Sequence, residues 1–222
     1  MINIDSLYFS YGTSSFELTI PELSVIKKEK LAIIGPSGSG KTSLLKLISG
    51  ILLPQTGLIT IGSHAVNKVP DHTRRDFRIA NIGFIFQDFE LLDYLDVLDN
   101  IVHPFRITKA LKINAEVRSR AIKLAEELGI QDKLKSLPGT LSQGEKQRTA
   151  ICRALLSNPS LILADEATGN LDPNNKSKIL DALFECSNQY DATLVAVTHD
   201  HELLNRFDRV IDFNDYCQPN SK

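Results

Sequence analysis

The chain has 222 residues, of which 42% are hydrophobic and 23% are charged, and its formal net charge at pH 7 is -2. This composition is ordinary for a globular protein with a substantial buried core, and the charge balance argues against nucleic acid as the main partner. No apolar run approaches the length of about 18 residues that a membrane-spanning helix needs. We therefore expect a chain that is soluble or reaches a membrane only through a partner.

The cysteines and the local basic clusters indicate no separate functional site. Cys152, Cys186 and Cys217 are odd in number, and their spacing fits neither a zinc site nor a disulfide framework. We interpret Cys152 and Cys186 as small core residues of a reducing compartment. The three arginines within residues 74–78 are interpreted as a solvated or interface face rather than a nucleic-acid patch.

The chain begins with two strand-like segments. Residues 2–9 combine apolar and polar side chains in alternation, which predicts a strand in an antiparallel edge region. Residues 16–26 continue in that style, and Pro21 within them marks an edge strand or a turn. An antiparallel β region at the N-terminus is therefore expected.

Further along the chain, short apolar runs alternate with amphipathic segments. The runs are continuously apolar, as strands buried on both faces are, and the longer segments have helical spacing. The predicted strands cover 31–35, 82–87, 161–165 and 193–199, and the predicted helices cover 41–50, 142–158 and 174–189. Gly50 suits the position that follows the end of a helix. This alternation predicts an α/β fold with a mostly parallel sheet.

Residues 88–140 interrupt the alternation. They contain a charged amphipathic helix at 112–130 and no buried strand. We predict a helical subdomain inserted into a catalytic core of residues 1–87 and 141–222, so that the chain forms a single domain.

Residues 35–42, GPSGSGKT, match the pattern G-x-x-x-x-G-K-[ST] between a predicted strand and a predicted helix. Glycines let the backbone wrap so that successive N–H groups face phosphate oxygens, and the helix N-terminus adds a favourable dipole. Lys41 places a charge on the β- and γ-phosphates, and Thr42 offers a hydroxyl to Mg²⁺. The nucleotide-binding residues expected here are Gly35, Pro36, Ser37, Gly38, Ser39, Gly40, Lys41, Thr42 and Ser43.

Two carboxylates follow the predicted strand at 161–165. Asp165 ends this strand beside the phosphate loop, a position that suits Mg²⁺ binding, directly or through water. Glu166 is one residue further on, where it can polarise an attacking water. Two acids after an apolar run are usually a solvated strand end, and it is the phosphate loop that favours catalysis here.

Residues 141–148, LSQGEKQR, allow two interpretations. Ser142 and Glu145 have the S-x-x-E spacing of a capping box, which alone indicates only a well-capped helix. A capped helix N-terminus beside Gly144 also exposes backbone N–H groups and a hydroxyl, which are the groups that bind an anion. Since one phosphate loop already binds one triphosphate, a second anion site indicates a second nucleotide or the far side of the same one.

The LSQGE segment, about twenty residues before a strand that ends in Asp-Glu, resembles the signature sequence of ATP-binding cassette (ABC) ATPases. Other motifs of that family occur in the expected order. Tyr11 matches the aromatic residue that stacks on adenine, and Gln87 matches the glutamine that senses Mg²⁺ and the attacking water. Asp172 matches the D-loop, and His199 matches the switch histidine at the γ-phosphate. Each has an ordinary structural interpretation alone, but their common order makes the resemblance specific.

The resemblance implies ATP and Mg²⁺ as cofactors and a second copy of the chain as a partner. In such ATPases the signature helix of one copy closes over the nucleotide held by the other, so that two ATPs are sandwiched in the dimer. The residues implied at the metal are Thr42, Gln87 and Asp165, those in catalysis are Glu166, His199 and Gln87, and those of the signature are Ser142, Gln143, Gly144 and Glu145.

Within this family, residues 78–101 and 164–172 are similar to the lipoprotein-releasing, macrolide-export and cell-division cassettes. Ala167 stands where that subgroup usually has proline, and Gln143 stands where glycine is commonest. The resemblance implies an integral membrane permease subunit as partner, with residues 91–105 in the docking surface and no direct contact with nucleic acid. It places the chain at the cytoplasmic side of the inner membrane, peripheral through that subunit.

Two other classes of protein are weighed against this hypothesis. A soluble cassette that acts on nucleic acid or ribosomes usually shows tandem cassettes, long coiled-coil insertions or zinc cysteines, and none is visible. A P-loop kinase or GTPase is disfavoured by the signature, by the Asp-Glu pair and by the missing N-K-x-D guanine motif. We therefore expect an ATP-hydrolysing subunit that drives a separate membrane protein.

Overall fold

The computed structural model of the chain describes residues 1–12, 16–169 and 173–215, and within them two β-sheets. The first is antiparallel with strand order β2-β1-β4-β5, and the second is parallel with strand order β6-β7-β8-β3-β9. The strands are β1 Ile2–Ser10, β2 Glu17–Val25, β3 Lys30–Ile34, β4 Thr56–Ile61, β5 His64–Ala65, β6 Ile82–Ile85, β7 Leu161–Asp165, β8 Thr193–Val197 and β9 Arg209–Asp212. The predicted α/β fold with an N-terminal antiparallel region is confirmed, and Pro21 lies in the edge strand β2.

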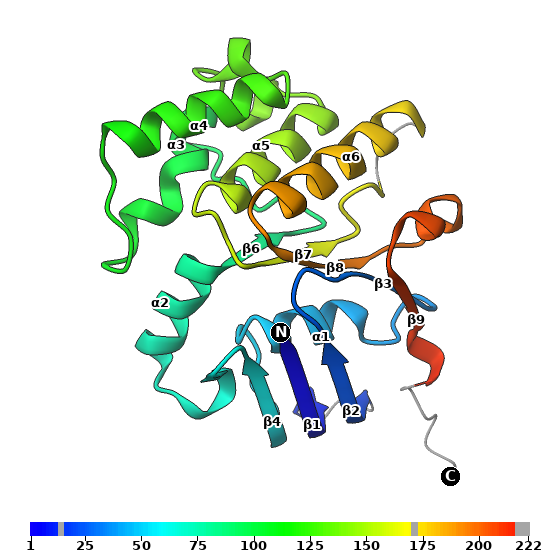
Figure 1. Cartoon of the computed structure of the whole chain (residues 1–222). Helices are drawn as coiled ribbons and strands as arrows, with labels where there is room; N and C mark the ends of the chain where they lie inside the picture. The colour runs from blue at the N-terminus through cyan, green and yellow to red at the C-terminus, as the bar shows by residue number, and fades with distance from the viewer. Residues whose placement is uncertain (13–15, 170–172, 216–222) are drawn as a thin grey trace.

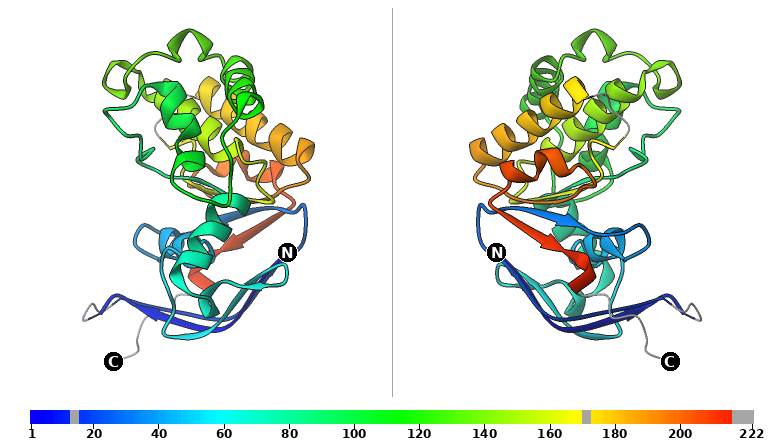
Figure 2. Two further views of the ribbon diagram at one scale, coloured as in Figure 1. Left: turned by 90° about the vertical axis from the view of Figure 1, so that its left-hand side faces the viewer. Right: turned by 90° about the vertical axis from the view of Figure 1, so that its right-hand side faces the viewer.

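The helices form layers around these sheets (Figures 1 and 2). Helix α1 lies between the two sheets, and α3 to α6 cover the opposite face of the parallel sheet. The α-helices are α1 Lys41–Ile48, α2 Asp71–Asn81, α3 Val97–Val102, α4 Ala115–Glu127, α5 Gln143–Leu155 and α6 Pro173–Gln189. Of the helices in the described ranges, none combines the length and the apolar character that crossing a bilayer requires.

The parallel sheet separates two hydrophobic cores. Because successive side chains of a strand point to opposite faces, Leu161 and Leu163 of β7 pack against α1 and the antiparallel sheet, whereas Ile162 and Ala164 pack against α3 to α6. All five residues of β7 and of β8 are buried. Burial on both faces explains why these strands read as continuous apolar runs rather than as alternating ones.

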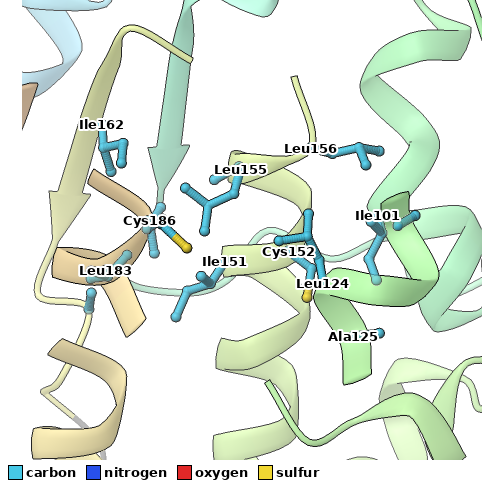
Figure 3. Close-up of a cluster of buried hydrophobic side chains, with 14 of the residues drawn as sticks. Ile101, Leu124, Ala125, Ile151, Cys152, Leu155, Leu156, Ile162, Leu183 and Cys186 are labelled. Atoms are coloured by element: carbon cyan, nitrogen blue, oxygen red, sulfur yellow. The ribbon is translucent and has the colours of Figure 1, made fainter. Parts of the chain in front are cut away.

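Helix α5 runs through the middle of the second core (Figure 3). Its Ile151 side chain faces β7 and α6, and its Cys152 side chain faces α3 and α4. Cys152 and Cys186 are both buried, which confirms their interpretation as core residues. Burial raises the pKa of both thiols, that of Cys186 to about 11, so both stay protonated at neutral pH. Cys217 lies outside the described residues.

Residues 88–140 contain α3, α4 and short 3₁₀ turns but no strand, as predicted. Asp96 caps α3 by accepting a hydrogen bond from the backbone of Asp99, and Asn114 caps α4 by accepting one from Val117. The buried side of this segment joins the core around α5. The boundary of a separate helical subdomain stays a prediction.

The basic cluster is interpreted as a solvated or interface face, and the solvated alternative is wrong for Arg74, which is only 9% exposed on α2. Its guanidinium donates hydrogen bonds to the Asp71 carboxylate at 2.7 Å and to the Val69 carbonyl at 3.2 Å. Arg78 donates to the carbonyls of residues 49 and 50, which end α1. Arg74 therefore ties α2 to the backbone that precedes it, and Arg78 joins α2 to the end of α1, where a cation is favourable.

Candidate functional site

A pocket of about 580 Å³ lies at the carboxyl ends of the parallel strands β3, β7 and β8. That edge of a parallel sheet is where α/β proteins bind ligands, and the volume is within the usual range for a small-molecule site. The lining residues are Tyr11, Phe16, Ser37, Gly38, Gly40, Lys41, Thr42, Ser43, Gln87, Glu166 and His199. The structure thus gathers predicted residues from five separate segments of the sequence.

The loop between β3 and α1 is shaped by glycines that no other residue replaces without strain. Gly40 directly precedes α1 with φ of 98°, and a Cβ atom there would lie 2.6 Å from Cζ of Phe16. Gly38 also has a positive φ of 80°. These conformations favour glycine and let the loop turn tightly into the N-terminus of α1, where backbone N–H groups and the helix dipole attract an anion.

Lys41 lies at the first position of α1 and its side chain is turned back into this loop. Its ammonium group donates hydrogen bonds to the carbonyl of Gly35 at 2.9 Å and to the carbonyl of Pro36 at 2.7 Å. The Lys41 side chain is buried against this loop. A phosphate bound inside this loop would therefore be within reach of a fixed positive charge.

Thr42 lines the pocket, and its hydroxyl meets the carboxylate of Asp165, which is buried behind the lining. The Thr42 hydroxyl donates a hydrogen bond of 3.1 Å to Oδ1 of Asp165, although β3 and β7 are separated in the sheet by β8. Burial raises the pKa of Asp165, while this hydrogen bond opposes the rise. A cation at this position would relieve the cost of burying the carboxylate.

Glu166 and His199 face each other at the mouth of the pocket. Glu166 follows β7 with a positive φ of 48°, and its N–H donates to the carbonyl of Val197 at the end of β8. His199 follows β8, and its Nε2 lies 2.9 Å from Oε1 of Glu166. The left-handed turn at Glu166 is uncommon for a residue with a side chain, and it directs the carboxylate toward His199.

One wall of the pocket is aromatic. The Tyr11 hydroxyl is 2.9 Å from the Ser43 hydroxyl, and the ring packs edge-on against Phe9 with centroids 4.8 Å apart. Phe16 contacts Tyr11 with centroids 5.7 Å apart. Phe16 was not predicted at the site, because an aromatic residue at the start of an apolar-polar strand is usually a core residue. In the sequence, only its position five residues after Tyr11 could have indicated Phe16 as a residue of the site.

The remaining predicted residues lie in different places. Gln87 is exposed and lines the pocket two residues after β6 ends. Ser142 and Glu145 form the predicted capping box, in which the Ser142 N–H donates to the Glu145 carboxylate at 2.7 Å and the Glu145 N–H donates to the Ser142 hydroxyl at 3.4 Å. The hydrogen bonds from Ser142, with help from Lys133, lower the pKa of Glu145. The segment 142–145 does not line the pocket. Asp172 lies outside the described residues.

The fold and the site together define a class of protein. A parallel sheet carries a glycine-rich phosphate loop, a lysine and a threonine at the start of the next helix, and an acidic pair at the end of β7, one strand removed from β3. This combination is that of the P-loop nucleotide hydrolases.

Comparison with known proteins identifies the family within this class. Residues 18–169 match the model of the ABC transporter family. The chain is 40% identical to the lipoprotein-releasing system ATP-binding protein LolD of Legionella pneumophila (strain Paris), over 95% of this chain and 93% of that protein. It is 38% identical to the LolD protein of Psychrobacter arcticus, over 93% and 91% of the two chains.

Solved structures agree with this assignment. The dimeric, post-hydrolysis structure of the ATP-binding cassette MJ0796 bound to ADP and Pi superimposes with a TM-score of 0.87 at 30% identity, covering 96% of this chain and 94% of that one. The chain belongs to the ABC transporter family. It is an ATP-hydrolysing subunit of the transporter type, and the comparisons support this reading over a soluble cassette that acts on nucleic acid or ribosomes.

Proposed function

We propose that the pocket binds ATP with its phosphates in the loop at 35–40 and hydrolyses the γ-phosphate bond there. Lys41 would neutralise the β- and γ-phosphates, and the exposed ring of Tyr11 would stack on adenine. Glu166 would accept the proton of the attacking water, and His199 would contact the γ-phosphate beside it. The contact between Glu166 and His199 supports these roles, since it places a base and a donor at the same end of the pocket.

Thr42, Asp165 and Gln87 carry the kind of oxygen ligands that fit a magnesium ion. Mg²⁺ in phosphate-transfer sites is usually bound by one or two protein oxygens together with phosphate oxygens and water. Thr42 and Asp165 offer a hydroxyl and a carboxylate oxygen 3.1 Å apart, and Gln87 lines the same pocket. We propose that these three residues hold the ion, which would neutralise charge on the phosphates when it is bound.

The observation that carries the proposal of a dimer is the position of the signature segment. The capping box lies at an exposed helix end outside the pocket, and in it the Ser142 N–H and hydroxyl both donate to the Glu145 carboxylate. A helix N-terminus of this kind also suits an external anion that competes for these donors. A second copy, related by a two-fold axis, would bring Ser142 and Gly144 to the γ-phosphate held by the first copy. The related cassette MJ0796 has been solved as a dimer, which supports this arrangement.

A shallow apolar groove supports docking of a membrane subunit. It has a volume of about 150 Å³ and runs between α2, β6, the 3₁₀ turn His103–Arg106 and α5, with Phe84, Phe86, Pro104 and Ile107 among its lining residues. Ile107 is 60% exposed, and Tyr94 on the preceding segment is 76% exposed. We propose that an integral membrane permease subunit docks here and holds the chain at the cytoplasmic side of the inner membrane. In this arrangement the chain would make no direct contact with nucleic acid.

The names of the relatives indicate the process that is driven. Relatives over nearly the whole length are ATP-binding proteins of lipoprotein-releasing systems. We propose that this chain powers lipoprotein release or a related export step, in which closure of the ATP dimer transmits force to the membrane subunit rather than passing substrate through the ATPase.

A test of this function uses Glu166→Gln. We expect ATP turnover to fall by about 10²- to 10⁴-fold, because the general base is lost, while ATP binding is kept and an ATP-dependent dimer accumulates. Turnover, nucleotide affinity and mass by light scattering measure these effects. Glu126→Gln, an exposed carboxamide substitution on α4, is the matched control and should behave as the parent chain. Near-parental turnover of Glu166→Gln would show that Glu166 is not the base.

The partner is tested with the same variant. Tagged Glu166→Gln chain is recovered with ATP from gently solubilised native membranes, and co-purifying proteins are identified by mass spectrometry. A membrane protein with few spans and a large extracytoplasmic domain supports the proposal. Ribosomes or DNA-binding proteins without a membrane protein contradict it.

A further inference from the structure

The segment that follows Gln87 has an unusual backbone. Phe89 has φ of 62° and Glu90 has φ of 50°, so two successive residues with side chains occupy the left-handed region. This region disfavours bulky residues, and such conformations persist only where the surroundings impose them. Within the segment, the Phe89 N–H donates to the Phe86 carbonyl and the Glu90 N–H donates to the Asp88 carbonyl. The carbonyls of Phe89 and Glu90 take no part in these two hydrogen bonds.

Arg153, near the end of α5, binds both of these carbonyls. One terminal nitrogen of its guanidinium donates to the Phe89 carbonyl and the other donates to the Glu90 carbonyl. The two groups are more than sixty residues apart in the sequence, so this contact joins distant parts of the chain. A planar guanidinium spans two adjacent carbonyls as a fork, whereas an ammonium group has no comparable fixed geometry.

The environment of Arg153 favours this role over that of an ordinary surface cation. Burial lowers the pKa of its guanidinium to about 10, and the nearby Glu90 carboxylate opposes the fall, so the group is still charged at neutral pH. Arg153 is half-buried and lines a groove, and the two carbonyls offset the cost of partly burying its charge.

We propose that Arg153 is a positioning residue for ATP hydrolysis, which holds the turn at Phe89 and Glu90 so that Gln87 stays in the nucleotide pocket. This inference rests on the proposed role of Gln87. Arg153 touches neither the pocket nor the signature segment, but it lies on α5, whose first turn carries that segment. One helix would thus fix the place of Gln87 in its own subunit and present Ser142 to the other. Arg153 also lines the docking groove, together with Phe86 and Ile107.

The test compares the ATP turnover of the parent chain with that of its variants, each purified at full length. Each is assayed at protein concentrations above which turnover per chain no longer rises. For Arg153→Met we expect a fall in kcat of about tenfold or more with KM for ATP within about twofold of the parent, because a catalytic group is misplaced while nucleotide binding is kept. Arg153→Lys keeps the charge but not the fork, and its kcat should be intermediate. An unchanged kcat in the folded Arg153→Lys and Arg153→Met chains would overturn the proposal.

Arg120→Met is the matched control. Arg120 also donates from its guanidinium to a backbone carbonyl, that of Leu156 just beyond α5, but it lies away from Gln87. Its removal should lower the melting temperature without changing kcat. A loss of kcat in Arg120→Met equal to that in Arg153→Met would show a general effect of loosening α5 and would overturn the specific role.

A double-mutant cycle distinguishes the positioning role of Arg153 from the catalytic role of Gln87 on which it rests. Gln87→Ala alone should lower kcat, and Arg153→Met should have little further effect in that background, because both changes remove the same contribution. Additive losses would overturn the positioning role of Arg153 while leaving Gln87 in catalysis. Parental turnover of Gln87→Ala would instead refute the proposed role of Gln87.

Discussion

Gly83 lies where the parallel sheet and helix α5 approach each other closely, and we expect Gly83→Ala to destabilise the chain. A Cβ atom on Gly83 of β6 would lie 2.5 Å from the carbonyl oxygen of Ala154 on α5, whereas ordinary contact begins near 3.4 Å. The backbones must therefore separate by about 0.9 Å, against the close packing of a protein interior. Overpacking of this kind costs about 1–3 kcal/mol, which for a chain of this size lowers the melting temperature by about 2–12 °C.

Thermal unfolding followed by circular dichroism measures this effect, with urea unfolding as an independent check. Gly139→Ala is the matched control, because a Cβ there meets nothing within 4 Å and the glycine has no positive φ that a side chain would strain. Since alanine restricts the unfolded chain more than glycine does, this variant should be neutral or slightly more stable. A melting temperature of Gly83→Ala equal to or above that of the parent would show that the close contact with Ala154 does not exclude a side chain at residue 83.

Two further predictions concern the pocket. Because burial raises the pKa of Asp165, the native chain binds more protons than the unfolded chain between the ordinary aspartate pKa and the raised one, and its stability falls as the pH rises through that interval. Asp165→Asn should therefore melt higher than the parent at pH 7 without nucleotide, and the difference should shrink toward pH 4; a lower melting temperature at pH 7 would contradict this. Tyr11→Ala should weaken ATP binding by about tenfold through lost stacking, whereas Tyr11→Phe keeps the ring and should change affinity by less than about twofold. Equal losses in isothermal titration of the two variants would show that the hydrogen bond to Ser43, not the ring, matters.

Buried strands and the phosphate loop were predicted from the sequence because their signals are local. The strand at 161–165 has the same bounds in the structure, and Gly50 follows the end of α1 in a left-handed conformation, as expected. The capping box at Ser142 also formed as predicted. In each case neighbouring residues determine the conformation, so a single sequence contains the information.

Elements that depend on distant partners were missed. Helix α2 carries few apolar residues and its arginines resemble a solvated patch, yet Arg74 is buried against Asp71 and the backbone. Strand β9 joins the sheet only by pairing with β3, and its burial alternates, so no continuous apolar run indicates it. Phe16 and Arg153 became visible only through contacts with residues far away along the chain.

The turned-back side chain of Lys41 has a consequence for the energetics of the nucleotide cycle. Its ammonium group is bonded to the carbonyls of Gly35 and Pro36, so a phosphate that takes up this charge has to displace existing partners. Phosphate binding at the loop would thus exchange these hydrogen bonds for an ion pair, and its net free energy would be smaller than the strength of that ion pair suggests. The exchange would run in reverse when product leaves, because the ammonium group has the loop carbonyls to return to. Nucleotide bound in this way would be released more readily in each cycle than nucleotide held by a lysine without such partners.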